Sequence, residues 1–381
     1  MEKRGGVMTA IHAYPRPPLS TLRRAPSAAM RKALAFAPHL TRFSRDALHL
    51  VFSALGARRG APVWCPSFHC GMEVRAAAVA GFTPRFYRLH DDLSVDEQHL
   101  AQCLGQEGGP VLLIHYFGFV QPGTVRIAAL CRANDVPLIE DCSHAFLSRF
   151  NGEPIGTTGA AATFSLYKTL GTSDGGALRV DRAIIDIAEL DLQSPRRPPV
   201  AWSAQWGSIR RRWRDRPPLA RVEETIAARF LRRNATAWRR IFEEPWHAGR
   251  GISGLSLALI ERLDPERIAA RRRRNYARLD AMLRDTAGYR PVTASLPDEC
   301  CPLYLPIFIH DRSTAFVKLF AARVEPFIFG MFHHPDMAVD AFPESRAMRD
   351  DIVCLPIHHD LGDADIDRVA SLVRPLLGTS L

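Results

Sequence analysis

Hydrophobic positions in the first half of the chain follow two periods that alternate along the sequence. Short apolar runs, typical of buried strands, lie at 61–66, 83–89, 110–118, 137–141, 160–168 and 175–180. Amphipathic stripes, which predict helices, lie at 43–60, 71–82, 94–104 and 122–136. Ser44 is the expected N-cap of the first of these helices. Alternation of this length predicts an α/β fold in which helices cover both faces of a mostly parallel sheet.

The pattern changes twice in the second half of the chain. Five of the six tryptophans and many arginines fall between 183 and 250, which we interpret as a helical insertion. Beyond it, 251–283 is strongly helical, runs at 301–309 and 324–329 predict strands, and 354–377 closes with a helix whose first turn is acidic. The expected division is an N-terminal arm (1–40), a large domain (41–182), the insertion (183–250) and a smaller α+β C-terminal domain (251–381).

Composition narrows the class of protein. Hydrophobic residues make up 47% and charged residues 24% of the 381 positions, and no apolar run is long enough for a spanning helix. Because no signal-peptide pattern is present, we expect a cytoplasmic protein whose eight cysteines are reduced thiols. The net charge of +10 is compatible with a nucleic acid, an anionic membrane or a phosphate-bearing substrate. Surface arginines explain this charge more simply, and we expect no nucleic-acid partner.

Polar residues that end predicted strands are the candidates for chemistry, because ligands of parallel sheets bind beyond the carboxyl ends of the strands. Asp141 ends the run 137–141, and Lys168 ends the run 160–168. From its position alone, Asp141 could equally cap a helix, form a structural ion pair or hold a cationic group of a ligand. Lys168 is one of four lysines in a chain with 46 arginines. Lysine readily loses its proton and condenses with an aldehyde, whereas arginine does not.

An amine and a carboxylate in one pocket are the pair that pyridoxal 5'-phosphate requires. The amine would anchor the aldehyde as a Schiff base, and the carboxylate would keep the ring nitrogen protonated, so that the ring acts as an electron sink. Ser165, three residues before Lys168, offers a hydroxyl to the phosphate. The helix that starts near Ser44 offers free backbone N–H groups, with Arg45 as an added cation. Together these residues predict a pyridoxal-phosphate site.

The same segments resemble a known family. The stretches PLIEDCSHAF (137–146) and GEPIGTTGAAATFSLYKTLGTSDGGAL (152–178) are similar to the core of the DegT/StrS-type sugar aminotransferases, which are pyridoxal-phosphate enzymes of the aspartate aminotransferase fold. Less specific similarity covers residues 40–182 and 251–380. The resemblance implies that Asp141 pairs with the pyridine nitrogen, that Lys168 forms the covalent link, and that Ser165 binds phosphate.

The resemblance assigns further residues to the cofactor site. His144 falls near the ring hydroxyl, and Ser44, Arg45 and Asp46 fall at the phosphate turn. The aromatic residue on the ring face would be Phe68 or His69, although simple counting reaches Cys70. Two departures from the family are visible: three residues instead of five separate the serine from the lysine, and no asparagine matches the partner subunit's usual phosphate ligand around 249–256.

The activity implied by the resemblance is transfer of an amino group to a nucleotide-linked keto sugar, in glycan or secondary-metabolite biosynthesis. Glutamate is the expected amino donor and a homodimer the expected assembly. One alternative is a pyridoxal-phosphate sugar dehydratase, which Lys168 disfavours because such relatives carry histidine there. The other is a degenerate, non-catalytic or regulatory member of the same fold. The sequence identifies neither the sugar, the nucleotide nor the donor.

Three further patterns have simple interpretations. The Trp- and Arg-rich segment 200–245 is more typical of a lid or dimer helix than of a weak membrane-surface contact, which stays open. Cys65, Cys70 and His69 match no zinc spacing, so we expect no metal. His115 either lines the pocket or is a hydrogen-bonded core histidine. The pairs His333–His334 and His358–His359 are expected at the surface or the substrate rim.

Overall fold

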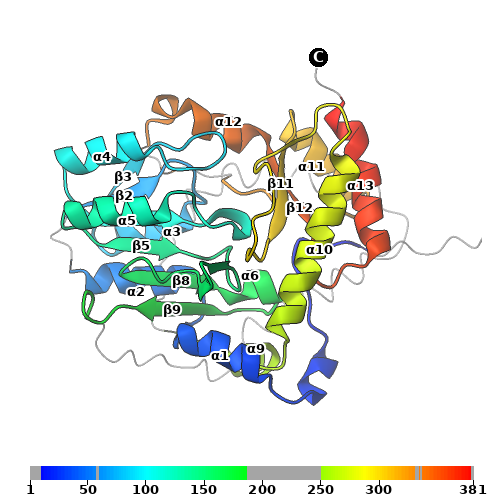
Figure 1. Cartoon of the computed structure of the whole chain (residues 1–381), viewed down its shortest axis with the longest axis horizontal. Helices are drawn as coiled ribbons and strands as arrows, with labels where there is room; N and C mark the ends of the chain where they lie inside the picture. Colours follow the sequence, from blue (N-terminus) through cyan, green and yellow to red (C-terminus); the bar gives the residue numbers. More distant parts are fainter. Residues whose placement is uncertain (1–9, 57–59, 187–249, 331–333, 335–336, 379–381) are drawn as a thin grey trace, which may run out of the picture.

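A computed structural model describes residues 10–56, 60–186, 250–330, 334 and 337–378 of the chain (Figure 1). Its largest feature is a seven-stranded sheet with the order β1-β9-β8-β5-β4-β2-β3. The strands are β1 (His39–Thr41), β2 (Pro62–Pro66), β3 (Thr83–Tyr87), β4 (Val111–Ile114), β5 (Leu138–Asp141), β8 (Ala161–Ser165) and β9 (Gly176–Val180). Strands β3, β2, β4, β5 and β8 pair in parallel, and only β9 runs antiparallel to its neighbours. The predicted mostly parallel sheet is confirmed.

Helices cover both faces of this sheet, and the alternation of side chains along β4 shows how. Val111 and Leu113 join a core cluster with α4 (Glu97–Gln106) and α5 (Thr124–Ala133). Leu112, which points to the opposite face, joins a cluster with α2 (Ser44–Ala54) and α3 (Met72–Val79). All residues of β4 and β5 are buried, as expected for central strands between two helical layers.

The C-terminal part has its own antiparallel sheet, with the order β10-β11-β12. The strands and helices of the C-terminal part are β10 (Arg290–Pro291), β11 (Tyr304–Phe308), β12 (Ile352–Pro356), α9 (Gly254–Ile260), α10 (Pro265–Leu283), α11 (Arg312–Ala321), α12 (Pro343–Asp351) and α13 (Asp363–Leu377). Asp264 caps α10 by accepting from the backbone N–H groups of Glu266 and Arg267. Helices α10 and α13 lie side by side (Figure 1). The predicted helices at 251–283 and at the C-terminus are therefore confirmed, including the acidic first turn of α13.

Shorter elements connect these parts. They are η1 (Leu19–Arg23), α1 (Ala28–Phe36), η2 (Tyr116–Gly118), β6 (Arg149–Phe150), β7 (Glu153–Pro154), α6 (Leu166–Leu170) and η3 (Val339–Ala341). Residues before α1 run along the C-terminal part, where the Ile11 N–H donates to the carbonyl of Arg323 at 2.8 Å. Met30 and Leu34 of α1 pack in a core cluster with Phe164 and Leu170. The first described residues thus contact both the large sheet region and the C-terminal part.

Two expectations about local structure are wrong. The run 324–329 forms no strand: Val324 makes an isolated bridge to Ile11, and Phe327 makes one to Cys354. Pro326, which lies between them, has no N–H to donate and so interrupts a ladder. Ser44 is not the N-cap of α2, because that position is taken by Phe43, whose backbone N–H donates to Asp46 Oδ2 at 3.1 Å.

The insertion predicted at 183–250 lies almost wholly outside the described residues. The segment 200–245, with its open membrane-surface alternative, lies outside them too, as does His333. Within the described ranges, no helix is both long enough and apolar enough to cross a bilayer.

Candidate active site

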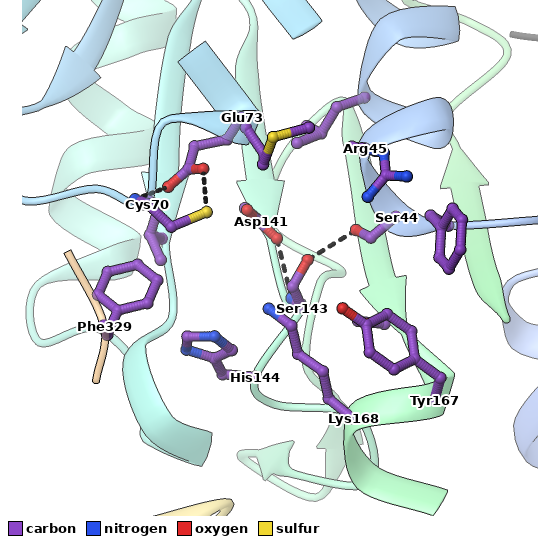
Figure 2. Close-up of a pocket in the computed structure, with 15 residues that line it drawn as sticks. Ser44, Arg45, Cys70, Glu73, Asp141, Ser143, His144, Tyr167, Lys168 and Phe329 are labelled. Atoms are coloured by element: carbon purple, nitrogen blue, oxygen red, sulfur yellow. Dashed lines mark hydrogen bonds between the residues drawn. The ribbon is translucent and has the colours of Figure 1, made fainter. Parts of the chain in front are cut away.

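A cavity opens beyond the carboxyl ends of β4, β5 and β8, where the sequence predicted a ligand site. Ile114, Asp141 and Ser165, which are the last residues of these strands, all line it. Figure 2 shows Lys168 pointing into this cavity toward Asp141, with Cys70 and Phe329 to one side and Arg45 and Ser44 to the other. The parallel register explains why these strand ends lie together, because Asp141 aligns with both Ile114 of β4 and Thr163 of β8.

Asp141 is held at the centre of the large sheet. It is only 6% exposed, and its Oδ1 accepts a hydrogen bond from the Ser143 N–H at 2.9 Å. Since β5 is fully buried and paired on both sides, the carboxylate sits on the most constrained part of the fold. An acid placed in this way can hold a cationic group of a ligand in a fixed position.

Lys168 lies on α6, the short helix that follows β8 directly. Among the described residues it makes no hydrogen bond and no ion pair. Withdrawal from solvent alone would lower the pKa of its amine, but Tyr167, Cys70, Asp141 and Glu73 outweigh that effect and raise the pKa. The side chain is therefore an ammonium group with acidic neighbours and no committed partner, which leaves it available to a ligand.

The start of α2 forms the opposite wall of the cavity. The hydroxyl groups of Ser44 and Ser143 share a hydrogen bond of 2.6 Å, and the Arg45 guanidinium stacks over the Phe43 ring at 4.2 Å. Ser44 and Arg45 line the cavity, as predicted residues of a phosphate turn would, whereas Asp46 does not. Burial raises the pKa of Asp46 to about 6, with Arg45 opposing that shift. Asp46 serves here to hold the helix start together.

Two buried polar atoms in the cavity wall have no hydrogen-bond partner among the residues that the structure describes. One is Ser165 Oγ, and the other is His144 Nε2. The Phe117 N–H donates to Nδ1 of His144 at 3.3 Å, so the ring proton is on Nε2. Burial, and then Lys168, lower the pKa of His144 well below its ordinary value, so the ring is a neutral donor. Such unpartnered groups are expected where a polar ligand supplies the missing hydrogen bonds.

The two candidates for the residue on the ring face, Phe68 and His69, lie outside the cavity lining. Cys70 lines the cavity, while neither Phe68 nor His69 does. Phe68 is fully buried and packs on the ring of Phe329 at 5.2 Å, and His69 stacks on Phe86 at 5.4 Å. The aromatic residues of this loop thus belong to the core, and the residue reached by counting faces the cavity.

Several lining residues were not identified from the sequence. Glu73 accepts from both the backbone N–H and the thiol of Cys70, each at 2.7 Å. Its place at the start of the predicted helix 71–82, three residues after Cys70, is a signal that could have found it. Ser143 and Tyr167 are chain neighbours of Asp141 and Lys168 and could have been found by proximity. Phe329 carries no such signal, because it comes from the C-terminal part.

His334 and His358, which were expected at the surface or the substrate rim, are instead buried, at 8% and 4% exposure, and His115 belongs to a buried polar cluster. His115, Glu140 and Cys142 offer ligand atoms within 4.8 Å of one another. However, His115 Nε2 bonds Glu140 Oε2 at 3.0 Å and its Nδ1 accepts from the Gln121 N–H. The other oxygen of Glu140 accepts from the N–H groups of Thr158 and Gly159. These bonds already use both ring nitrogens of His115 and both carboxylate oxygens of Glu140.

Comparison with known proteins gives a consistent result. Residues 43–204 match the profile of the DegT/DnrJ/EryC1/StrS aminotransferase family. A GDP-perosamine synthase from Vibrio cholerae is 31% identical over 143 residues, which are 36% of this chain and only 38% of the relative. The aminotransferase TlmJ from Streptoalloteichus hindustanus is 24% identical, with a TM-score of 0.65 over 97% of this chain and 98% of its own.

A second solved structure contains the expected cofactor. Spr1654 from Streptococcus pneumoniae, in its PLP form, has a TM-score of 0.69 and 14% identity over 98% of this chain and 100% of its own. The predicted aspartate aminotransferase-like fold is confirmed by these structural neighbours.

Proposed function

Since residues 43–204 of this chain match the profile of the DegT/DnrJ/EryC1/StrS aminotransferase family, we propose that the protein is a pyridoxal-phosphate-dependent aminotransferase of this family. The proposed reaction moves an amino group, with glutamate as the expected donor, to a nucleotide-linked keto sugar for glycan or secondary-metabolite biosynthesis. We propose that it acts in the cytoplasm as a homodimer, with residues 41–182 as the cofactor-binding domain and 251–381 as the small domain.

The observation that carries this proposal is the meeting of Lys168 and Asp141 in one cavity. The two residues lie 27 positions apart in the sequence, yet both line the same space at the carboxyl edge of the sheet. Pyridoxal phosphate, when bound, supplies an aldehyde for covalent attachment and a ring that stabilises negative charge on the reacting carbon. The residues present fit it, because the cavity offers a lysine amine, a buried carboxylate and unpartnered donors.

Each lining residue has a distinct task in this proposal. Asp141 would hold a proton on the ring nitrogen. Ser165, the backbone N–H groups at the start of α2 and Arg45 would bind the phosphate, a combination suited to an anion. His144 would donate from Nε2 to a ring substituent. Cys70 would cover one ring face, with its thiol fixed by Glu73.

Lys168 would act as the mobile base of the reaction. Its raised pKa means that the amine must lose a proton to the bound reactants before it can accept one from the substrate carbon. Positioned acid–base catalysis of this kind typically contributes about 10²–10⁴-fold to a rate. Because the amine has no hydrogen-bond partner within the described chain, it is free to move within the cavity.

The proposed sugar substrate rests on the relative that is named as a GDP-perosamine synthase, since its name implies a GDP-linked product. Arg45 at the cavity wall supports a phosphate-bearing substrate, because guanidinium groups bind phosphate in a bidentate manner. Arg42 does not line the cavity, but its guanidinium lies 5.2 Å from the centre of the Phe43 ring, on which Arg45 also stacks, so a second cation lies behind this wall.

The experiment combines cofactor capture with product analysis. The purified protein and its Lys168→Ala variant are incubated with pyridoxal phosphate, reduced with borohydride and digested, and peptide masses locate any label. A label on Lys168, followed by glutamate-dependent amination of one member of a panel of nucleotide-linked keto sugars, supports the proposal. Dehydrated sugar products would indicate the dehydratase alternative. Absence of any label would indicate the non-catalytic alternative and refute the proposed activity.

A further inference from the structure

Arg272, on α10 in the C-terminal part, is buried to an unusual degree for a charged residue. It is 1% exposed and is the largest of the fully buried side chains. Within the described ranges it forms no ion pair with a carboxylate. Burying an unpaired charge is costly, and replacing such groups by apolar ones often stabilises a protein. A cation kept in this position therefore suggests a role other than stability.

The contacts of Arg272 join two parts of the chain. One terminal nitrogen, Nη1, donates to the carbonyl of Leu303 at 3.0 Å, just before β11. The other, Nη2, donates to the carbonyl of Thr169 at 2.8 Å. Thr169 is the residue after Lys168, on α6. The planar guanidinium thus spans from the C-terminal part to the turn that carries the reactive amine.

Leu166 and Leu170 of the turn pack in a core cluster, but within the described residues the turn has few other polar anchors. Its helix has only five residues and is capped by Gly171, which has φ +78° and where a Cβ would clash with the carbonyl of Pro15. The Tyr167 N–H reaches the Gly175 carbonyl at 3.3 Å, which is a long hydrogen bond. So short a helix has little stability of its own. Its position must therefore depend on external contacts such as that of Arg272.

We propose that Arg272 is a positioning residue for Lys168, which couples the C-terminal part to the turn α6. The proposal rests on the proposed function only in taking Lys168 as the reactive amine. A fixed guanidinium sets the position of the Thr169 carbonyl and hence the direction in which the preceding side chain leaves the turn. Movement of the C-terminal part relative to the large sheet would then move the amine.

The neighbouring Arg271 provides a matched control. It lies on the same helix and donates twice to the carbonyl of Leu361, at 3.0 and 2.8 Å, with Asp363 at 3.3 Å. All of these partners belong to the C-terminal part, so Arg271 has arginine-to-carbonyl bonds without a link to α6.

The test compares the full chain with Arg272→Met, Arg272→Lys and Arg271→Met. The first measurement is amide hydrogen exchange of peptides that cover residues 163–174, without added ligand. The loss of one hydrogen bond from a charged donor predicts about tenfold faster exchange in Arg272→Met, because local opening becomes easier. Arg272→Lys, which keeps the charge, should recover part of this protection. Arg271→Met should exchange like the wild type in this segment.

The second measurement uses bound pyridoxal phosphate. In Arg272→Met, the pH at which the visible absorbance of the bound cofactor changes should shift. The glutamate half-reaction should slow by about 10²-fold, because small misplacements of a catalytic group have effects of that size. If Arg272 has a purely structural role, Arg272→Met should have a lower melting temperature but should match Arg271→Met in amide exchange, absorbance titration and reaction rate. That result would overturn the proposal. If the wild type captures no pyridoxal phosphate, the proposed function fails, while the exchange comparison still decides the role of Arg272.

Discussion

Replacement of Asp141 by asparagine isolates the charge of the carboxylate at the centre of the cavity. The Ser143 N–H that donates to Oδ1 can donate to an asparagine oxygen in the same place, so the local backbone should persist. Because the side chain is 6% exposed, solvent would screen a charge partner at the ring nitrogen only weakly. The variant therefore removes one charge from a buried pair while leaving its geometry intact.

The expected effect follows from the cost of an unpaired buried charge. Removing one partner of such a pair costs about 3–5 kcal/mol, which corresponds to about 10²- to 10⁴-fold in the rate of the glutamate half-reaction. Stopped-flow absorbance of the cofactor measures this rate, and thermal unfolding checks that the fold is kept.

Asp174→Asn is the control for this experiment. Asp174 is 3% exposed and accepts from the Ser253 hydroxyl at 2.8 Å, but it does not line the cavity. Its variant should react at the wild-type rate. A folded Asp141→Asn protein that reacts as fast as Asp174→Asn would refute the assignment of the carboxylate to the ring nitrogen.

Three further predictions test other parts of the site. Ser165→Ala should leave the melting temperature unchanged, because Oγ has no partner in the described part of the chain, and should weaken pyridoxal-phosphate affinity about tenfold or more in an absorbance titration; unchanged affinity would remove Ser165 from the phosphate site. In the wild type, the raised pKa of Asp46 contributes stability that is present below pH 3.8 and is lost as the pH rises through about 6. Asp46→Asn should therefore remove up to about 3 kcal/mol of pH dependence from the unfolding free energy, as followed by denaturant titrations across that range; parallel pH profiles for the two proteins would contradict this cause. Glu73→Ala should lower the unfolding free energy by about 1–3 kcal/mol, since it leaves the partly buried Cys70 N–H without its acceptor. The same variant should speed alkylation of Cys70, because Glu73 adds to burial in raising the pKa of that thiol, and a thiol that reacts no faster would argue against this pairing.

Much of the fold was predictable because periodicity reports burial. The strands β4 and β5 are continuous apolar runs since helices cover both of their faces, and the long helix α10 carries a clear stripe. The error at 324–329 arose because an apolar run cannot show how Pro326 will interrupt pairing. The error at Ser44 arose because its hydroxyl is bonded to that of the sequence-distant Ser143 at 2.6 Å, while Asp46 accepts from the Phe43 N–H and so places the cap one residue earlier.

The candidate site was predictable only in part, for a related reason. Asp141 and Lys168 could be placed because each comes at or just after a strand end, and parallel strands bring such ends together. The ring face could not be placed, because the direction of Phe68 is decided by distant partners such as Phe329 and Tyr116. Likewise, no local pattern announces that Arg272 will reach across to Thr169.

The origin of Phe329 has a consequence for how this scaffold can change. One wall of the space around Lys168 is encoded more than 150 positions downstream, and its ring also contacts those of Phe117 and His144 at 5.8 and 5.0 Å. Exchanging the C-terminal third with that of a relative would therefore reshape the chamber even if every residue before 183 were kept. If segments of related proteins were recombined, the new C-terminal segment would have to supply Phe329 itself or another residue that packs against Phe117 and His144.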